Sequence, residues 1–203
     1  MAEKIKLTKN ELQRQQRELR KYQRYLPTLQ LKKQQLQLEV RKSELELENK
    51  KSEFQRAIDE IQDWVDLFSD FSEQDWLEFI KIQQVNTSPA NVAGVKIQIF
   101  ENIDFVVKPY SFFSTAPWLD FAVTHIKKLL SLKEQVRILA ETAQALRNEL
   151  RKTTQRVNLF EKVMIPRCEE NIRIIKIYLG DEERNAVGRA KIAKRKLLAT
   201  TGS

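Results

Sequence analysis

A seven-residue repeat of apolar residues is the feature that most constrains how this chain folds. Counted in sevens from Leu12, eight of nine positions are apolar, and counted in sevens from Gln15, six of nine are apolar. The first set is Leu12, Leu19, Leu26, Lys33, Val40, Leu47, Phe54, Ile61 and Phe68, and the second is Gln15, Tyr22, Leu29, Leu36, Ser43, Lys50, Ala57, Trp64 and Phe71. Together they form one apolar stripe on a helix that packs against another helix. About 60 residues of α-helix span roughly 90 Å.

Pro27 lies inside this first repeat. Proline has no backbone N–H, and its ring collides with the preceding helical turn. The sequence therefore predicts a kink or a short break near residues 24–28.

A second repeat of the same kind covers residues 129–164. Its two sets are Leu129, Val136, Ala143, Leu150, Val157 and Met164, with Leu132, Leu139, Leu146, Thr153 and Phe160. The apolar pattern then continues at Ile165, Cys168, Ile172, Ile175 and Leu179. The step from Val157 to Ile165 is eight residues instead of seven, and Pro166 follows directly. A shift of register at a proline predicts a local bend or unwinding in a continuing helix.

Neither long helix buries its apolar stripe alone, so the two stripes predict an antiparallel helix pair. The predicted fold is dominated by α-helix: a long antiparallel two-helix coiled coil, with a small connector at one end. Both chain termini are then expected at the opposite end. The predicted segments are a first long helix over 1–71, a connector over 72–120, and a second long helix with a basic tail over 121–203.

The connector is predicted to contain a short helix and a β-hairpin. SEQDWLEFIKIQQV (72–85) has a capping serine followed by an apolar run, which is typical of a helix start, and NTSPAN (86–91) is rich in turn-forming residues. In VKIQIFENIDFVVK (95–108), apolar residues alternate on either side of Glu101 and Asn102. This alternation predicts two strands with their turn at Glu101-Asn102.

The positive charge of the chain is concentrated at its two ends. The formal net charge is +8, and residues 1–33 carry ten Lys/Arg against three Asp/Glu, while residues 181–203 carry six against three. Three interpretations stay open: solvated helix ends, a tip that meets a polar or electronegative partner surface, or a nucleic-acid contact. Tyr22 and Tyr25 lie among the first basic residues, but no nucleic-acid-binding motif accompanies them.

Several kinds of chemistry lack the residues that they need. The four glycines do not form a phosphate-binding loop, and the single histidine, His125, provides no metal-ligand or Cys–His pair. Cys168 is the only cysteine and is interpreted as a small buried apolar residue. The beginning of the chain is not a signal peptide, and no stretch is apolar enough to span a membrane. We expect no catalytic residues, no metal and no cofactor.

Two stretches resemble the D subunit of the V-type and A-type rotary ATPases. The first, KLTKNELQRQQRELRKYQRYLPTLQLKKQQL, resembles the opening helix of that family, and the second, RKTTQRVNLFEKVMIPRCEENIRIIKIYL, resembles its C-terminal signature more closely. The matching positions in the second are Lys152-Thr153, Arg156-Val157-Asn158, Phe160-Glu161, Ile165-Pro166 and Glu169-Glu170. The resemblance covers both predicted long helices, about two thirds of the chain.

This resemblance implies a central rotor stalk that is not itself catalytic. Such a stalk transmits torque between the ring of catalytic A and non-catalytic B subunits and the membrane rotor, in ATP synthesis or in ATP-driven transport of protons or sodium ions. The implied partners are the A, B and F subunits and a membrane-side adaptor. The implied location is cytoplasmic, on a membrane-bound complex and reaching the membrane only through partners. The isolated chain is expected to be a monomer that binds no nucleic acid.

The candidate functional residues are basic side chains at the two ends and the residues near the two prolines. We expect the ring-facing tip to comprise Arg14, Arg17, Arg20, Lys21, Arg24, Arg189, Lys191, Lys194, Arg195 and Lys196. Pro27, Ile165 and Pro166 are candidates for the bends that make the coil asymmetric. Ser43, Lys50 and Thr153 are polar breaks in the stripes, which either fix the register or mark the seat of the F subunit.

A different class of function fits the same pattern: a coiled-coil scaffold or a basic helical protein associated with nucleic acid. A scaffold is expected to self-associate through its apolar stripes. A nucleic-acid-binding protein is expected to lose affinity steeply as salt rises.

Overall fold

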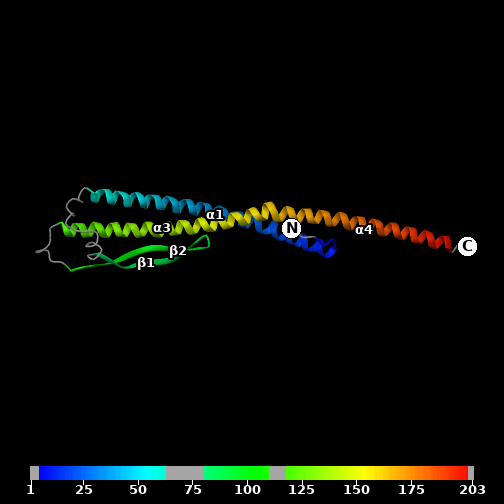
Figure 1. Ribbon diagram of the computed structural model, residues 1–203, viewed down its shortest axis with the longest axis horizontal. Helices are drawn as coiled ribbons and strands as arrows, with labels where there is room; N and C mark the ends of the chain where they lie inside the picture. The colour runs from blue at the N-terminus through cyan, green and yellow to red at the C-terminus, as the bar shows by residue number, and fades with distance from the viewer. Residues whose placement is uncertain (1–4, 63–79, 110–117, 201–203) are drawn as a thin grey trace. The chain divides into compact units, whose positions relative to one another are not determined.

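The computed structural model describes residues 5–62, 80–109 and 118–200. The helices are α1 (Lys9–Gln62), α3 (Leu119–Leu159) and α4 (Ile165–Thr200), with a π-helical turn, η2 (Phe160–Met164), between the last two. The strands are β1 (Ile80–Val92) and β2 (Val95–Val107) (Figure 1). The chain divides into two compact units, residues 1–32 with 153–203 and residues 33–152, and α1 contributes to both.

The apolar stripe of α1 is confirmed as the buried face of the helix. Every stripe position from Leu12 to Ile61 is buried or half-buried. Leu36 and Val40 are 0% and 7% exposed, and Leu36 is among the largest fully buried side chains. The predicted stripe positions Trp64, Phe68 and Phe71 lie outside the described residues.

α1 continues through Pro27 without interruption, so the short break predicted there does not occur. Pro27 is exposed. The backbone carbonyl that loses its helical donor therefore lies on the solvent side, where water can satisfy it. Tyr22, one turn earlier, packs its ring against Phe160 at a centroid distance of 5.1 Å, and this contact helps to hold the helix in place.

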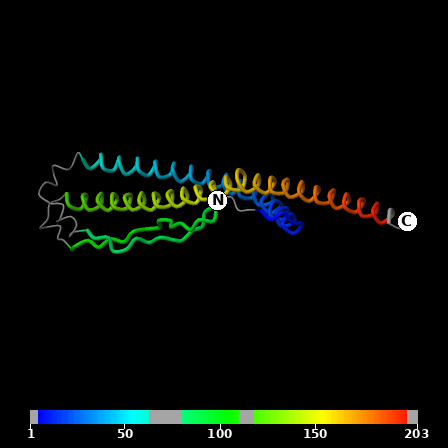
Figure 2. The backbone as a smooth tube through the Cα atoms, turned by 45° about the vertical axis from the view of Figure 1, so that its right-hand side comes forward, coloured from blue at the N-terminus to red at the C-terminus, as the bar shows by residue number. Residues whose placement is uncertain are grey.

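In the unit formed by residues 33–152, α1 and α3 run antiparallel (Figure 2). Two ion pairs join them: Arg147 Nε lies 2.7 Å from Glu44 Oε1, and Lys128 Nζ lies 3.5 Å from Glu60 Oε2. As the residue number rises on α1 it falls on α3, which is the predicted antiparallel arrangement. These pairs are exposed, so each contributes only about 0–1 kcal/mol. The buried stripe carries more of the stability.

The hairpin exists, but its turn is not where the sequence pattern placed it. β1 and β2 pair antiparallel, and Val92 pairs with Val95 across Ala93 and Gly94. Ala93 and Gly94 have φ of 50° and 82°, which a two-residue type I′ turn requires. Glu101, predicted in the turn, is the extra residue between the pairs Thr87–Phe100 and Asn86–Asn102, and therefore forms a β-bulge.

Two further predictions for the connector are wrong, because the turn lies at Ala93 and Gly94. NTSPAN is part of β1 instead of a turn, and residues 80–85 of the predicted short helix are strand. Residues 72–79 of that predicted helix lie outside the described residues. A β-strand tolerates Pro89 because each strand of a two-stranded sheet has one unpaired edge.

The hairpin folds back along α3, beside that helix in both views (Figures 1 and 2). At its base, Ile80 is buried with Leu119 and Val123. At its turn, Val92, Ala93 and Val95 pack against Leu36, Val40 and Leu146. α3 therefore has a second apolar face, which it uses for the hairpin.

In the unit formed by residues 1–32 and 153–203, the first turns of α1 pack against η2 and α4. The shifted stripe positions Ile165, Cys168, Ile172, Ile175 and Leu179 are all buried or half-buried, as predicted. The extra residue between Val157 and Ile165 is accommodated in η2, where the backbone N–H of Ile165 donates to the carbonyl of Phe160 five residues earlier. A π-helical turn holds one more residue than an α-helical turn. The predicted unwinding before Pro166 therefore takes this form.

Candidate functional site

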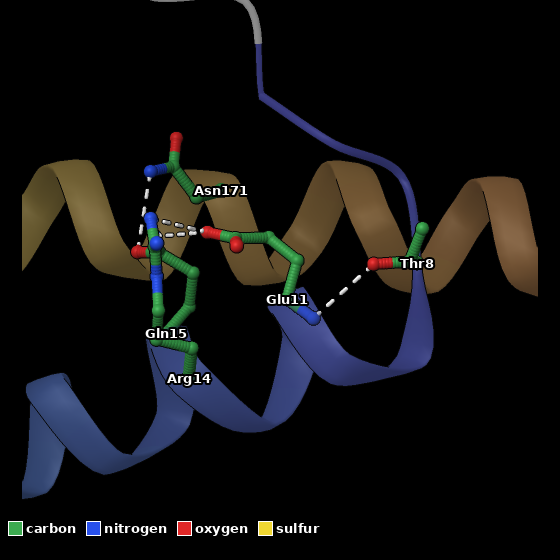
Figure 3. Close-up of polar contacts among 5 residues, drawn as sticks. All are labelled: Thr8, Glu11, Arg14, Gln15 and Asn171. Carbon is green, nitrogen blue, oxygen red and sulfur yellow. Dashed lines mark hydrogen bonds and ion pairs between the residues drawn. The ribbon is translucent and has the colours of Figure 1, made fainter.

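A polar layer crosses the interface between α1 and α4. The Asn171 side-chain amide donates a hydrogen bond to Gln15 Oε1 at 3.3 Å (Figure 3). Both residues lie inside the seam, with Gln15 6% and Asn171 7% exposed. A buried amide pair of this kind disfavours any register that leaves either amide without a partner.

The layer continues to the start of α1 (Figure 3). Gln15 Nε2 donates to Glu11 Oε1 at 2.9 Å, and Arg14 approaches the same oxygen at 2.9 Å. The Glu11 backbone N–H donates to Thr8 Oγ1 at 3.3 Å, so Thr8 acts as the N-cap of the helix. The Glu11 carboxylate is 11% exposed and is held by two donors on its own helix. It therefore supports Gln15 in the orientation that accepts from Asn171.

An aromatic contact and a buried thiol lie next to the polar layer. Burial raises the pKa of Tyr22, and Glu18 and Cys168 raise it further. Burial is also the main cause that raises the pKa of the Cys168 thiol, with Glu18 and Glu169 adding to the effect and Arg167 opposing it. The thiol is 4% exposed and stays protonated at neutral pH. It behaves as the small apolar residue that the sequence predicted.

Beside this thiol is a cavity of about 360 Å³ between the first turns of α1 and the start of α4. Its walls combine carboxylates (Glu11, Glu18) with guanidinium groups (Arg14, Arg167). Lys6 adds a third cationic group, and the near balance of three cations and two carboxylates gives the cavity no clear preference for an anion or a cation.

The structure separates the ten predicted tip residues into two groups. Arg14, Arg17, Arg20, Lys21 and Arg24 lie on α1 alongside the segment of α4 and η2 that contains Asn171 and Phe160. The other five, Arg189, Lys191, Lys194, Arg195 and Lys196, are all exposed and lie further along α4. From Asn171 to Arg189 the helix rises roughly 27 Å. Within the described residues, the two groups are therefore separated along α4.

The two groups are separated because α4 extends past the first residue of α1. Lys9, the first residue of α1, has its Nζ 3.7 Å from Glu183 Oε1 on α4. Beyond that point no other described segment lies beside α4 (Figure 1). From Arg184 to Leu197 every residue except Gly188 is exposed, and the apolar residues Val187, Ile192 and Leu197 are 56%, 57% and 67% exposed. This projecting helix end (residues 184–197) carries both cations and uncovered apolar side chains.

Two further observations concern chemistry and membranes. Within the described ranges, His, Cys, Asp and Glu side chains form no group of three or more that could hold a metal ion. None of the helices in the same ranges has an apolar stretch long enough to cross a membrane.

Of the two residues that form the polar layer, the sequence pattern indicated only one. Gln15 was recognisable as a polar residue at a stripe position. Asn171 was missed because the stripe shifts at Pro166 and the pattern 165, 168, 172 passes over it. A search for a polar residue next to the shifted stripe that could partner Gln15 is the signal that could have found it.

Long helices that pair antiparallel, with a β-hairpin folded along one of them, place this protein in the class of coiled-coil proteins with a hairpin connector. A comparison with protein families matches residues 11–195 to the model for the D subunit of ATP synthase. The chain belongs to this ATP synthase D-subunit family.

Similar curated proteins are D subunits of V-type ATP synthases in bacteria. The one from Borreliella burgdorferi is 43% identical over 136 residues, which is 66% of this chain and 66% of that protein. The one from Chlamydia caviae is 34% identical over 117 residues, 58% of this chain and 56% of that protein. A third, from Chlamydia trachomatis serovar L2, is 34% identical over 137 residues, 66% of this chain and 64% of that protein. The matched region thus spans between about half and two thirds of each relative.

Proposed function

We propose that this chain is the central stalk of a V/A-type rotary ATPase and transmits torque between a ring of A and B subunits and a membrane rotor. The observation that carries the proposal is the family match over residues 11–195, which includes the paired helices and the projecting helix end. Two helices that bury a shared stripe resist twisting better than one. The coil also contains the asymmetric element that a shaft needs, in the π-helical turn before Pro166.

The projecting helix end is the part that we propose to enter the ring. Its guanidinium and ammonium groups are exposed and suit carboxylates or carbonyls of a surrounding surface. Its uncovered Val187, Ile192 and Leu197 suit an apolar sleeve. Each exposed charge contact contributes about 0–1 kcal/mol, which allows the contacts to exchange as the shaft turns. The α1 group, Arg14 to Arg24, is proposed as a second zone of contact further from the helix end.

We propose that the F subunit covers an exposed leucine pair on α1. Leu38 and Leu45 lie seven residues apart, and they are 58% and 64% exposed. Both lie on the face of α1 opposite Leu36 and Val40, the residues that are buried in the seam. The pair supports the proposal because two leucines on one exposed face offer apolar area to a partner. Leu38→Gln with Leu45→Gln should leave the chain folded and remove the F subunit from the purified complex, while Gln37→Ala should retain it.

The torque proposal is tested by purifying a tagged copy from its native cells and assaying ATP hydrolysis of what accompanies it. Recovery of A, B and F subunits with ATPase activity supports the stalk, and single-molecule rotation of a bead attached to this chain completes the test. Recovery of the chain alone or with nucleic acid, while intact A–B complex stays behind, contradicts it and favours the scaffold alternative. Reversing the charge of Lys191, Lys194 and Lys196 together should weaken the assembly in a salt-dependent manner.

A further inference from the structure

A groove lies where α1, α3 and β2 meet, within the unit of residues 33–152. Its volume is about 490 Å³. Most of its walls come from three elements, and β1 adds only Val92, next to the turn of the hairpin. α1 contributes Glu39, Lys42, Ser43 and Glu46, β2 contributes residues 97–101, and α3 contributes Gln135, Ile138, Leu139, Thr142 and Leu146. The groove contains no part of the projecting helix end or of the leucine pair assigned above.

The floor of the groove holds a polar group that lacks a partner. Ser43 is 6% exposed, and its Oγ is a buried oxygen with no hydrogen-bond partner within the described residues. A buried hydroxyl without a partner is destabilising, so a native structure that keeps one calls for an explanation. A ligand that offers a hydrogen-bonding group at this point provides one.

The wall formed by β2 is an unpaired strand edge. Among the described residues β2 pairs with β1 alone, and residues 97–101 line the groove consecutively. Successive side chains of a strand point to opposite faces. A cavity that touches five consecutive residues therefore lies beside the edge of the strand and not over one of its faces.

The pairing register shows which backbone groups point to that edge. Val92 and Val95 flank the two-residue turn, and such a turn is closed by a hydrogen-bonded pair. Bonded and non-bonded pairs alternate along an antiparallel ladder, so Asn91–Lys96, Pro89–Gln98 and Thr87–Phe100 are non-bonded pairs. Pro89, which has no N–H, fits a non-bonded position. The N–H and C=O groups of Lys96, Gln98 and Phe100 therefore point away from β1.

The charge and polarity of the groove restrict what can occupy it. Three carboxylates, Glu39, Glu46 and Glu101, face one ammonium group, Lys42, which is already 3.1 Å from Glu39 Oε1. Ile99 on the edge strand is 48% exposed, although Ile138 and Leu146 in the same groove are buried. The groove therefore favours cationic groups at its rim and apolar side chains inside it.

We propose that this groove binds an extended segment of a partner polypeptide, with alternating apolar and Lys/Arg residues, that adds a third strand to the free edge of β2. Strand addition uses the outward backbone groups of Lys96, Gln98 and Phe100 for affinity and side-chain pockets for selectivity. The Ser43 hydroxyl, buried in the free chain, rotates about χ1 into the groove and bonds to a polar group of the added strand. This binding does not depend on torque transmission, so it stands or fails separately from the proposed stalk function.

The experiment uses the full chain, labelled with ¹⁵N, and the peptide acetyl-Lys-Val-Lys-Val-Lys-Val-Lys-amide as the probe. Amide hydrogen exchange by NMR is measured with and without the peptide at low ionic strength. Strand addition should slow exchange at outward amides of β2, above all Gln98, and leave the outward amide of Asn91 on β1 unchanged. Absence of binding, or binding that protects no β2 amide, overturns the proposal, as does stronger binding of a peptide in which Glu replaces each Lys.

Matched proline variants separate edge pairing from general attraction. Gln98→Pro removes an outward N–H from β2, and Asn91→Pro does the same on the outer edge of β1, where Pro89 is already accepted. Gln98→Pro should weaken peptide binding by about tenfold, because one hydrogen bond is lost and the proline ring collides with the added strand. Asn91→Pro should change the affinity by no more than about twofold. Equal effects of the two variants contradict strand addition.

Ser43→Ala distinguishes a binding role from a structural one. Removing an unpartnered buried hydroxyl should raise the melting temperature of the free chain, because no hydrogen bond is lost. The same change should lower the affinity for the probe peptide by about fivefold, because the added strand loses a hydrogen bond to Ser43. A variant that is more stable and binds the peptide unchanged shows that Ser43 does not contact the occupant, and overturns that part of the proposal.

Discussion

Asn171 on α4 and Gln15 on α1, 156 residues apart in the chain, are joined by a side-chain hydrogen bond inside the seam that the two helices share. A polar layer in an apolar seam lowers stability but penalises misalignment, since a shift of one turn buries two unsatisfied amides. Because this layer lies near the start of α1, it sets the alignment of the two helices at that point. This alignment places Lys9 beside Glu183 and so determines that the projecting helix end begins at residue 184.

The first prediction concerns this amide pair. Asn171→Leu leaves the Gln15 amide buried with one partner fewer and should lower the free energy of unfolding by about 1–3 kcal/mol. The double variant Gln15→Leu with Asn171→Leu should regain most of that loss while permitting other registers. Urea unfolding gives the free energies, and analytical ultracentrifugation detects oligomers that form when the register is no longer selected. A double variant that is as unstable as the single one contradicts this account.

The second prediction concerns the turn of the hairpin. Gly94 has a φ of 82°, in the region that costs an L-residue about 1–2 kcal/mol. Gly94→Ala should therefore destabilise the hairpin and its packing on Leu36 and Leu146 by about that amount. Gly180→Ala is the matched control, because Gly180 lies within helix α4 and a Cβ added there meets nothing within 4 Å. That control should gain about 0.5–1 kcal/mol. Thermal unfolding of both variants measures the difference.

The third prediction concerns the dependence of stability on pH. Burial raises the pKa of Cys168 above its ordinary value of 9.0 in the folded chain. Above pH 9 the unfolded chain loses the thiol proton while the folded chain keeps it, so stability is fully present below this pH and falls as the pH rises beyond it. The raised pKa of Tyr22 acts in the same direction from its ordinary value of 10.0.

The measurement for this third prediction is urea unfolding from pH 7.5 to 10.5 on the parent chain and on Cys168→Ala. The alanine variant should be less stable at pH 7.5 but should lose less stability as the pH rises. The native thiol should also react slowly with a disulfide reagent at pH 8, and rapidly after unfolding. If the unfolding free energy falls with pH equally in both chains and the native thiol reacts rapidly, the prediction is wrong.

The fourth prediction concerns Pro166 as the origin of asymmetry. Proline in a helix interior costs about 3 kcal/mol relative to alanine, so Pro166→Ala should raise stability by as much as that. In the assembled enzyme the same change should lower the ratio of ions moved, or of ATP made, to shaft rotation, because losing the proline ring and regaining the N–H lets the helix after the π-helical turn straighten. Pro27→Ala is the control on the other helix. Unchanged coupling and turnover in Pro166→Ala would remove Pro166 from the mechanism.

The helices were predictable because their signal is local and repeated. From Leu12 to Ile61, the apolar repeat predicts the same helix at each turn, and a polar exception such as Lys33 does not change that prediction. The extra residue before Pro166 was also readable, since an eight-residue step in a seven-residue pattern requires one turn with more residues. The form of that turn, a π-helical one, follows from the need to keep both parts of the stripe against α1.

The hairpin was placed wrongly because two signals competed in it. The alternation around Glu101 and Asn102 is that of strands, but a turn also needs residues that adopt positive φ, and Gly94 provides one. The apolar run before NTSPAN resembled a helix when taken alone. Pairing with β2 and packing on α3 stabilise it as a strand, because the two strands then share one ladder of hydrogen bonds and half-bury alternate residues near the turn.

Sequence alone determined that two long amphipathic helices pair antiparallel, that a hairpin lies between them and that the ends are basic, because periodicity and charge belong to residues close together in the chain. Tertiary structure decided which residues meet: the Gln15–Asn171 layer, the separation of the two basic groups and the groove at Ser43. Those depend on where α1 begins relative to α4 and on how the hairpin folds along α3. Both are set by packing between segments far apart in the chain, which a local pattern does not encode.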